Sequence, residues 1–101
     1  MNNETDLVLQ ALLRYGLRMK RTALSAKEIH RQKVVIEDLL SENDAETLID
    51  AIRYGMPNVW PYTEDNRTFS AVDLEKNLLK AKAEAGQTKR AGEIAYRPGR
   101  G

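Results

Sequence analysis

The chain has 101 residues, of which 42% are hydrophobic and 31% are charged, and its formal net charge is +1. This length predicts one domain with a modest core, and the composition excludes an intrinsically disordered chain. Cysteine is absent, which excludes disulfides, thiolate metal sites and cysteine nucleophiles and agrees with the cytoplasmic location that we expect. The apolar runs are too short to span a bilayer, so no membrane contact is expected.

The first predicted helix covers residues 6–19. Thr5 is its expected N-cap, and Asp6 in the first turn complements the helix dipole. Its apolar stripe has the spacing of an amphipathic helix and consists of Leu9, Leu12, Leu13 and Leu17. Gly16 is expected to weaken the last turn, and residues 20–24 form a connection to the next helix.

The second predicted helix begins after Ser25 and ends near Leu40 or Ser41. Ser25 and Glu28 have the spacing of a capping box, in which each side chain bonds the other residue's backbone amide. The apolar residues expected on its buried side are Ile29, Ile36, Leu39 and Leu40.

The third predicted helix begins at Asn43, with Glu46 as the partner three residues further on. Its apolar face consists of Ala45, Leu48, Ile49 and Ile52. Gly55 is expected to end the helix, and Pro57 opposes its continuation.

An irregular, aromatic segment is predicted for residues 56–68, because it contains two prolines and a polar turn. Trp60 and Phe69 are expected to fold this loop back onto the core. A short two-stranded wing around residues 59–62 and 67–69 is the alternative.

A fourth helix is predicted over residues 71–85, capped by Ser70 with Asp73 at the third position. Its apolar surface consists of Val72, Leu74, Leu78, Leu79 and Ala81. Gly86 is the expected terminator, and residues 87–101 read as a flexible, basic C-terminal tail. The predicted fold is therefore all-α: residues 1–86 form one small bundle of about four helices, with an aromatic, Pro-containing loop between helices 3 and 4.

Charge is unevenly distributed along this nearly neutral chain. Residues 14–33 contain seven Lys or Arg and only one acid, Glu28, whereas residues 37–50 contain six acids and no base. Such asymmetry can steer a polyanion to one side of a small fold. Ordinary solvated helix faces explain the same pattern equally well, because a chain with many charges contains such blocks by chance.

The basic residues have spacings that suit a phosphate-binding surface. Arg14, Arg18 and Arg21 would share one face if the first helix continues that far, and Lys27 and Arg31 are one turn apart on the second helix. If the turn between the helices brings these ends together, the cations converge at one end of the domain. We therefore predict that these five residues bind nucleic acid, either DNA or RNA. An acidic protein surface is the other partner that this corner would suit.

Catalytic and metal-binding motifs are not recognisable in the sequence, so we expect neither enzymatic activity nor a cofactor. His30 is the only histidine, and its basic neighbours favour an exposed face over catalysis or metal binding. Trp60 and Tyr62 are the candidate residues for binding a partner protein, although core packing is the stronger interpretation of Trp60.

Four stretches within residues 12–85 form a recognisable pattern: Arg14-Tyr15-Gly16, residues 29–40, Leu48-Ile49-Asp50-Ala51-Ile52, and Trp60 before Phe69 and Leu74. In this pattern the chain resembles a helical module of phage replication accessory proteins of the DnaD-like and replication-initiator type. The resemblance implies DNA binding, or docking to a replicative helicase in a primosome-like assembly. A separate winged-helix domain of that family is not recognised, which favours an accessory or inhibitory role over loading. Gly55-Met56-Pro57 also resembles part of a phage small terminase subunit. We rank this resemblance below the resemblance to replication proteins.

The leading functional prediction is a small nucleic-acid-binding accessory protein of phage-type DNA replication. The alternative is a protein-interaction module, such as a phage-encoded inhibitor of a host machine, or a component of a virion or packaging machine.

Overall fold

Every regular element that the computed structural model describes, over residues 3–60 and 68–95, is a helix. Side chains are described as far as residue 88. The elements in chain order are α1 (Asn3–Ala11), η1 (Leu12–Leu17), η2 (Arg21–Ala23), α2 (Ala26–Leu40), α3 (Ala45–Asp50), η3 (Ala51–Gly55), α4 (Met56–Val59), α5 (Ala71–Lys76) and α6 (Leu78–Ala95). These elements confirm the predicted all-α class. Several of the short helices follow one another directly and join into a small number of longer helical segments.

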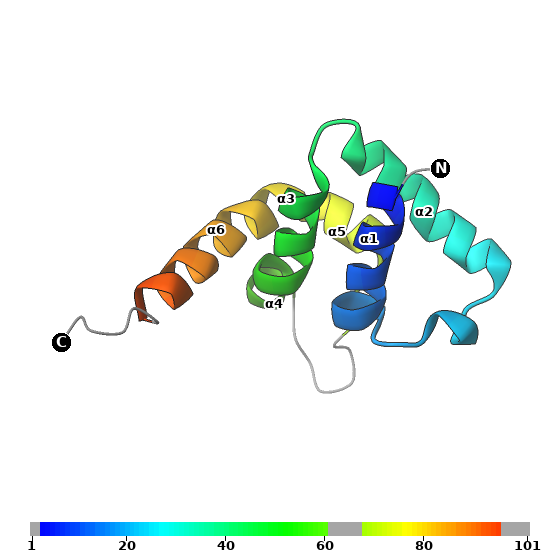
Figure 1. Cartoon of the computed structure of the whole chain (residues 1–101), viewed down its shortest axis with the longest axis horizontal. Helices are drawn as coiled ribbons and strands as arrows, with labels where there is room; N and C mark the ends of the chain where they lie inside the picture. Colours follow the sequence, from blue (N-terminus) through cyan, green and yellow to red (C-terminus); the bar gives the residue numbers. More distant parts are fainter. Residues whose placement is uncertain (1–2, 61–67, 96–101) are drawn as a thin grey trace.

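The helices pack around one core, to which every described helix except η2 contributes. α1 packs against α2 and α3, and α6 packs mainly on η3 while its last turns project away from the body (Figure 1). The largest fully buried side chains are Val8, Leu9, Leu12, Ile36, Leu48, Ile52, Met56 and Leu74. None of the helices that the structure describes is long and apolar enough to cross a membrane.

The first helical segment starts and stops earlier than predicted. Thr5 lies inside α1 and is only 3% exposed, so its predicted role as N-cap is wrong. The segment ends in η1, a π-helical turn, because Arg18 adopts the left-handed conformation with a φ of 55°. The backbone amides of Arg18 and Met19 both donate to the carbonyl of Leu13. A left-handed residue directly after the last turn is a common way to end a helix.

The second segment, α2, has the predicted bounds, and Ser25 is its N-cap as predicted. The predicted capping box is only half formed, because the Glu28 carboxylate contacts side chains further along α2. The Ser25 hydroxyl accepts a hydrogen bond from the Glu28 amide at 3.1 Å. Gln32 is 3% exposed and links this helix to α5, because its Oε1 accepts from the Ala71 amide at 2.9 Å. Its Nε2 donates to the Glu28 carboxylate at 3.4 Å, so both ends of this buried amide have a partner.

The third segment continues beyond its predicted end. α3 leads through the π-helical turn η3 into α4, so the predicted stop at Gly55 is wrong. Pro57 is the second residue of α4 and comes directly after the π-helical turn, so this proline does not prevent the helical segment from continuing. Gly55 serves packing instead: a Cβ there would come closer than 3.0 Å to three backbone atoms of Ala81 in α6.

The fourth predicted helix consists of two helices. Ser70 and Asp73 form the predicted capping box. The helix is interrupted at Asn77, which separates α5 from α6. Leu79 follows this break and is 84% exposed, and Val72 before the break is also exposed, so the prediction that these two residues lie on the apolar surface is wrong. α6 also continues through Gly86 to Ala95, so the predicted end at residue 85 is wrong. The flexibility of the predicted tail over residues 87–101 stays a prediction.

The aromatic segment packs in part as expected. Phe69 is 4% exposed, and Trp60 is half-buried against the core with its indole N–H donating to the Thr68 carbonyl at 3.1 Å. These contacts confirm the packing interpretation of both residues. Tyr62 and the polar turn lie outside the described residues, and Val59 ends α4 rather than beginning a wing strand.

The glycine contacts predict opposite effects for two alanine substitutions. Gly55→Ala should destabilise the fold by about 3 kcal/mol or more, because the new methyl group would meet backbone that cannot move aside independently. The matched control is Gly86→Ala in α6, where a Cβ has no neighbour within 4 Å. That variant should be stabilised by about 0.5 to 1 kcal/mol, because alanine loses less backbone entropy in a helix. Urea unfolding followed by circular dichroism measures the free energy of unfolding of both variants. Equal changes in the two variants would contradict the close contact of Gly55 with Ala81.

The N-cap of α3 predicts a pH dependence of stability. Asp44, not Asn43, caps this helix, and hydrogen bonds from the Thr47 side chain and backbone amide hold the pKa of the Asp44 carboxyl below its usual value. A lowered folded pKa means that the stabilisation is complete above the unfolded pKa, about 3.9, and is lost as the pH falls through the folded pKa. Asp44→Asn keeps a capping oxygen that does not titrate.

The stability difference between wild type and Asp44→Asn should therefore shrink as the pH falls from about 6 to about 3. Thermal unfolding across this range measures it. A difference that is independent of pH would show that the cap does not depend on the charge of Asp44.

Candidate nucleic-acid interface

The five predicted nucleic-acid-binding residues are all exposed, but they do not form the helical row that was expected. Arg14 lies in η1, Arg18 follows the end of that turn, and Arg21 begins the separate 3₁₀ helix η2. The helix ends at Leu17, so the condition under which these three arginines would share one helix face is not met. Their role in binding stays a prediction.

The predicted pair on the second helix is confirmed in its geometry. Lys27 and Arg31 are exposed one turn apart near the start of α2, and Arg31 pairs with Glu28 at 3.4 Å. His30 is exposed on the same helix, as expected from its basic neighbours. Lys33 instead pairs with Asp6 of α1 at 3.3 Å and so helps to join the two helices.

The exposed cations between Arg14 and Arg31 form what we call the basic edge: it consists of Arg14, Arg18, Lys20, Arg21, Lys27 and Arg31. These residues come from the end of η1, the connection that follows and the first turns of α2, which adjoin one another at one side of the molecule (Figure 1). The exposed acids come from the opposite end of α2 and the start of α3 and consist of Glu37, Asp38, Glu42, Asp44 and Glu46.

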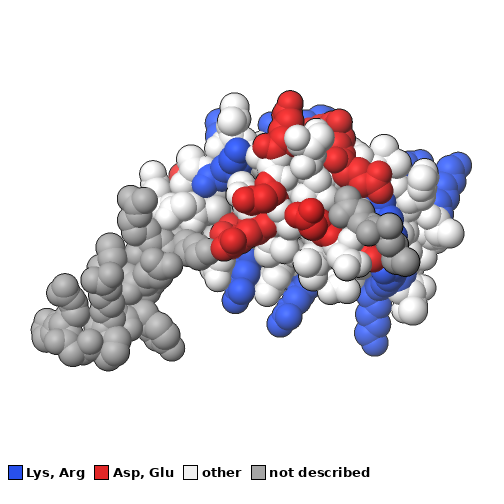
Figure 2. Space-filling model, turned by 45° about the horizontal axis from the view of Figure 1, so that its top comes forward, with Lys and Arg blue, Asp and Glu red and all other residues white. Residues whose placement is uncertain are grey.

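The two signs of charge are separated in space as well as in sequence. Figure 2 shows acidic side chains gathered over the middle of one face, whereas Lys and Arg side chains project from its margins. A polyanion is therefore repelled from the acidic surface and attracted to the basic one, which orients its approach.

A second cationic feature adjoins the basic edge and was missed by the sequence reasoning. The guanidinium carbon of Arg14 lies 5.3 Å from the centre of the Tyr15 ring, and that of Arg53 in η3 lies 5.5 Å from the same ring. Arg53 also lies 5.0 Å from the Tyr54 ring. These distances are within the range of cation–π attraction, so η1 and η3 are joined through alternating cations and aromatic rings. The two Arg-Tyr-Gly tripeptides in the sequence are the signal that could have revealed it.

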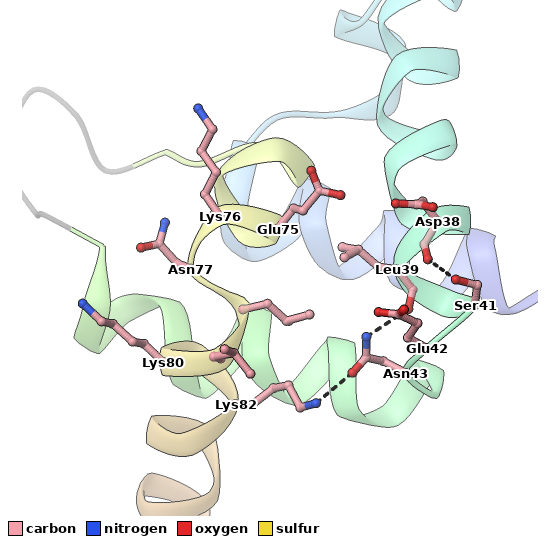
Figure 3. A pocket seen from close by; sticks show the side chains of 12 residues that line it. Asp38, Leu39, Ser41, Glu42, Asn43, Glu75, Lys76, Asn77, Lys80 and Lys82 are labelled. Atoms are coloured by element: carbon pink, nitrogen blue, oxygen red, sulfur yellow. Dashed lines mark hydrogen bonds between the residues drawn. The ribbon is translucent and has the colours of Figure 1, made fainter.

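A groove lies on another side of the molecule, between the α2–α3 loop and the junction of α5 with α6 (Figure 3). Its volume is about 690 Å³. At one end, Lys82 donates to the Asn43 side-chain oxygen at 2.8 Å, and Asn43 donates to the Leu39 carbonyl at 3.0 Å. The walls carry both acids and lysines, and the exposed Leu79 belongs to the rim.

No group of three or more His, Asp or Glu side chains in the described part of the chain is arranged to hold a metal ion. Comparison with known proteins found no matching family model, no matching curated protein and no matching solved structure.

Proposed function

We propose that this protein binds nucleic acid through the basic edge. The observation that carries the proposal is the exposure of all six of its cations, which come from consecutive elements of the chain. Among the described acids, only Glu28 pairs with one of these cations, the neighbouring Arg31. That pair is itself exposed, so solvent screens it and a phosphate can compete for the guanidinium.

The physical basis is the release of counterions from the phosphate backbone. Each phosphate that a Lys or Arg neutralises releases condensed cations, so affinity falls steeply as salt rises. A basic edge of this size favours binding that depends on charge rather than on base sequence. The separated acidic surface adds orientation, because it repels the same backbone.

The resemblance of several stretches to DnaD-like replication modules supports a more specific role. A small protein that holds DNA through one edge and leaves its other surfaces exposed suits an accessory function in phage-type DNA replication. DNA is therefore the nucleic acid that we propose, and a replication assembly is the proposed setting.

A protein-interaction function is the second candidate, and the groove beside Leu79 favours it. Leu79 lines this groove and is 84% exposed, so its side chain is available for apolar contact with a partner seated there. Such a module would obtain its binding energy from apolar contact and use the surrounding charges for steering.

Charge reversal on the basic edge tests the nucleic-acid proposal. The double variant Arg18→Glu with Arg31→Glu should weaken binding to a labelled DNA of about 20 nucleotides by at least about tenfold, because phosphate contacts are lost and repulsion is added. The matched control reverses two other exposed lysines, Lys76 and Lys80, which border the groove.

Fluorescence anisotropy across a salt series measures both variants. The control should retain affinity within about threefold, with the salt dependence of the wild-type protein. Equal losses in the two variants would show that net charge alone governs binding, and unchanged binding by Arg18→Glu with Arg31→Glu would remove the basic edge from the site.

A further inference from the structure

The tripeptide Arg-Tyr-Gly occurs twice in this chain, at residues 14–16 and 53–55, each time after a Leu or Ile. Both copies lie in π-helical turns, η1 and η3, and these two turns pack against each other. π-Helical turns are rare in proteins and occur frequently at functional sites. Two such turns with the same tripeptide therefore require a physical explanation.

Packing explains the glycine in each copy. A Cβ on Gly16 would lie 2.8 Å from the carbonyl oxygen of Phe69, whose amide donates to the Gly16 carbonyl at 3.1 Å. Gly55 approaches the backbone of Ala81 still more closely. In both turns, only a residue without a side chain lets a second segment lie directly on the helix.

Packing does not explain the arginine in each copy. Arg14 and Arg53 are exposed, so neither is required to fill the core. Their guanidinium groups instead lie over aromatic rings, with Arg53 between Tyr15 and Tyr54 and Arg14 beside Tyr15. We call these four residues the Arg–Tyr cluster. Tyr15 and Tyr54 are partly exposed, so the cluster as a whole lies at the surface.

The chemistry of this cluster suits an unpaired nucleotide. A guanidinium presents donors in its plane that match phosphate oxygens, and its flat face stacks on nucleobases. Tyrosine rings stack on bases of any sequence, and proteins that hold single strands combine such rings with cations that follow the backbone. In a duplex the base faces are covered by neighbouring base pairs, so a duplex offers the cluster only its phosphates.

The cluster is also continuous with the basic edge, because Arg14 belongs to both and Arg18 directly follows the turn that carries Arg14. A strand that lies along the basic edge would therefore reach the cluster without turning away from the protein.

We infer that the Arg–Tyr cluster is a stacking site for an unpaired base of single-stranded nucleic acid, which makes this protein a single-strand binder rather than a duplex binder. The inference rests on the proposed nucleic-acid function and adds the class of substrate and the residues that select it.

The test compares oligo(dT) with a duplex of equal length, about 20 nucleotides, at the same salt concentration. The double variant Arg53→Gln with Tyr54→Leu should lose about tenfold in affinity for oligo(dT), because a stacked base contributes roughly 1–3 kcal/mol. Its affinity for the duplex should change by less than about threefold, the reduction expected for one lost cation. Lys27→Gln is the matched control, which should weaken binding to both ligands by the same factor because it removes a phosphate contact alone.

Two further variants separate the site from an effect on folding. Arg53→Gln alone changes an exposed side chain and should keep the wild-type melting temperature while losing part of the single-strand preference. Tyr54→Phe keeps the ring and should bind oligo(dT) like the wild type. Oligo(rU) in the same assay distinguishes RNA from DNA as the bound strand. A loss of affinity for either single strand, without an equal loss for the duplex, supports the site.

The inference is overturned if nucleic acid is bound but the double variant loses equal affinity for strand and duplex, or loses none. Absence of wild-type binding to both ligands at low salt is a different result, because it would overturn the proposed function itself.

Discussion

The close approach of α6 to η3 at Gly55 is the contact on which the arrangement of this molecule depends. α6 makes its main contact with the core there, and the absence of a Cβ at Gly55 lets the Ala81 backbone lie directly on the turn. Gly16 has the same function at η1, where the Phe69 backbone crosses. The chain after the aromatic segment is thus held to the two π-helical turns, at Phe69 on η1 and at Ala81 on η3.

The same turns place the side chains that we connect with function. A glycine packed inward occupies one side of each turn, and the preceding Arg and Tyr lie at or near the surface. Because η1 and η3 pack together, their arginines and tyrosines interdigitate rather than forming two separate sites. The pair of Arg-Tyr-Gly turns therefore both holds the packed helices together and carries the side chains of the proposed binding site. The basic edge extends this surface. The exposed acids lie at the other end of α2, away from the basic edge.

Features set by local chemistry could be predicted from the sequence, and features set by distant contacts could not. Ser25 and Ser70 were identified as caps because a cap depends on residues within one turn. Gly55 and Gly86 were both interpreted as helix stops, but one is required by a contact 26 positions away and the other lies within a continuing helix. Leu79 follows the break at Asn77 and is exposed, and apolar periodicity gave no sign of that break.

The candidate site divides in the same way. The exposed cations followed from composition, but their expected row on one helix required Arg18 to be helical, and its left-handed conformation ends the helix instead. Arg53 and Tyr54 were missed because they lie far from the basic block in sequence and reach it only through the packing of η3 on η1. The repeated tripeptide carried that information, although its meaning depends on both copies forming adjacent turns.

Nuclear magnetic resonance mapping of the bound surface tests the central claim most directly, namely that the paired turns and the basic edge form one binding surface for a single strand. Titration of isotope-labelled protein with oligo(dT) should shift the amide signals of residues 14–21, 27–31 and 53–54 together, with one affinity. The signals of the acidic stretch, residues 37–46, should remain in place. Shifts confined to the groove beside Leu79, or shifts in the basic edge without any at residues 53–54, would contradict the account.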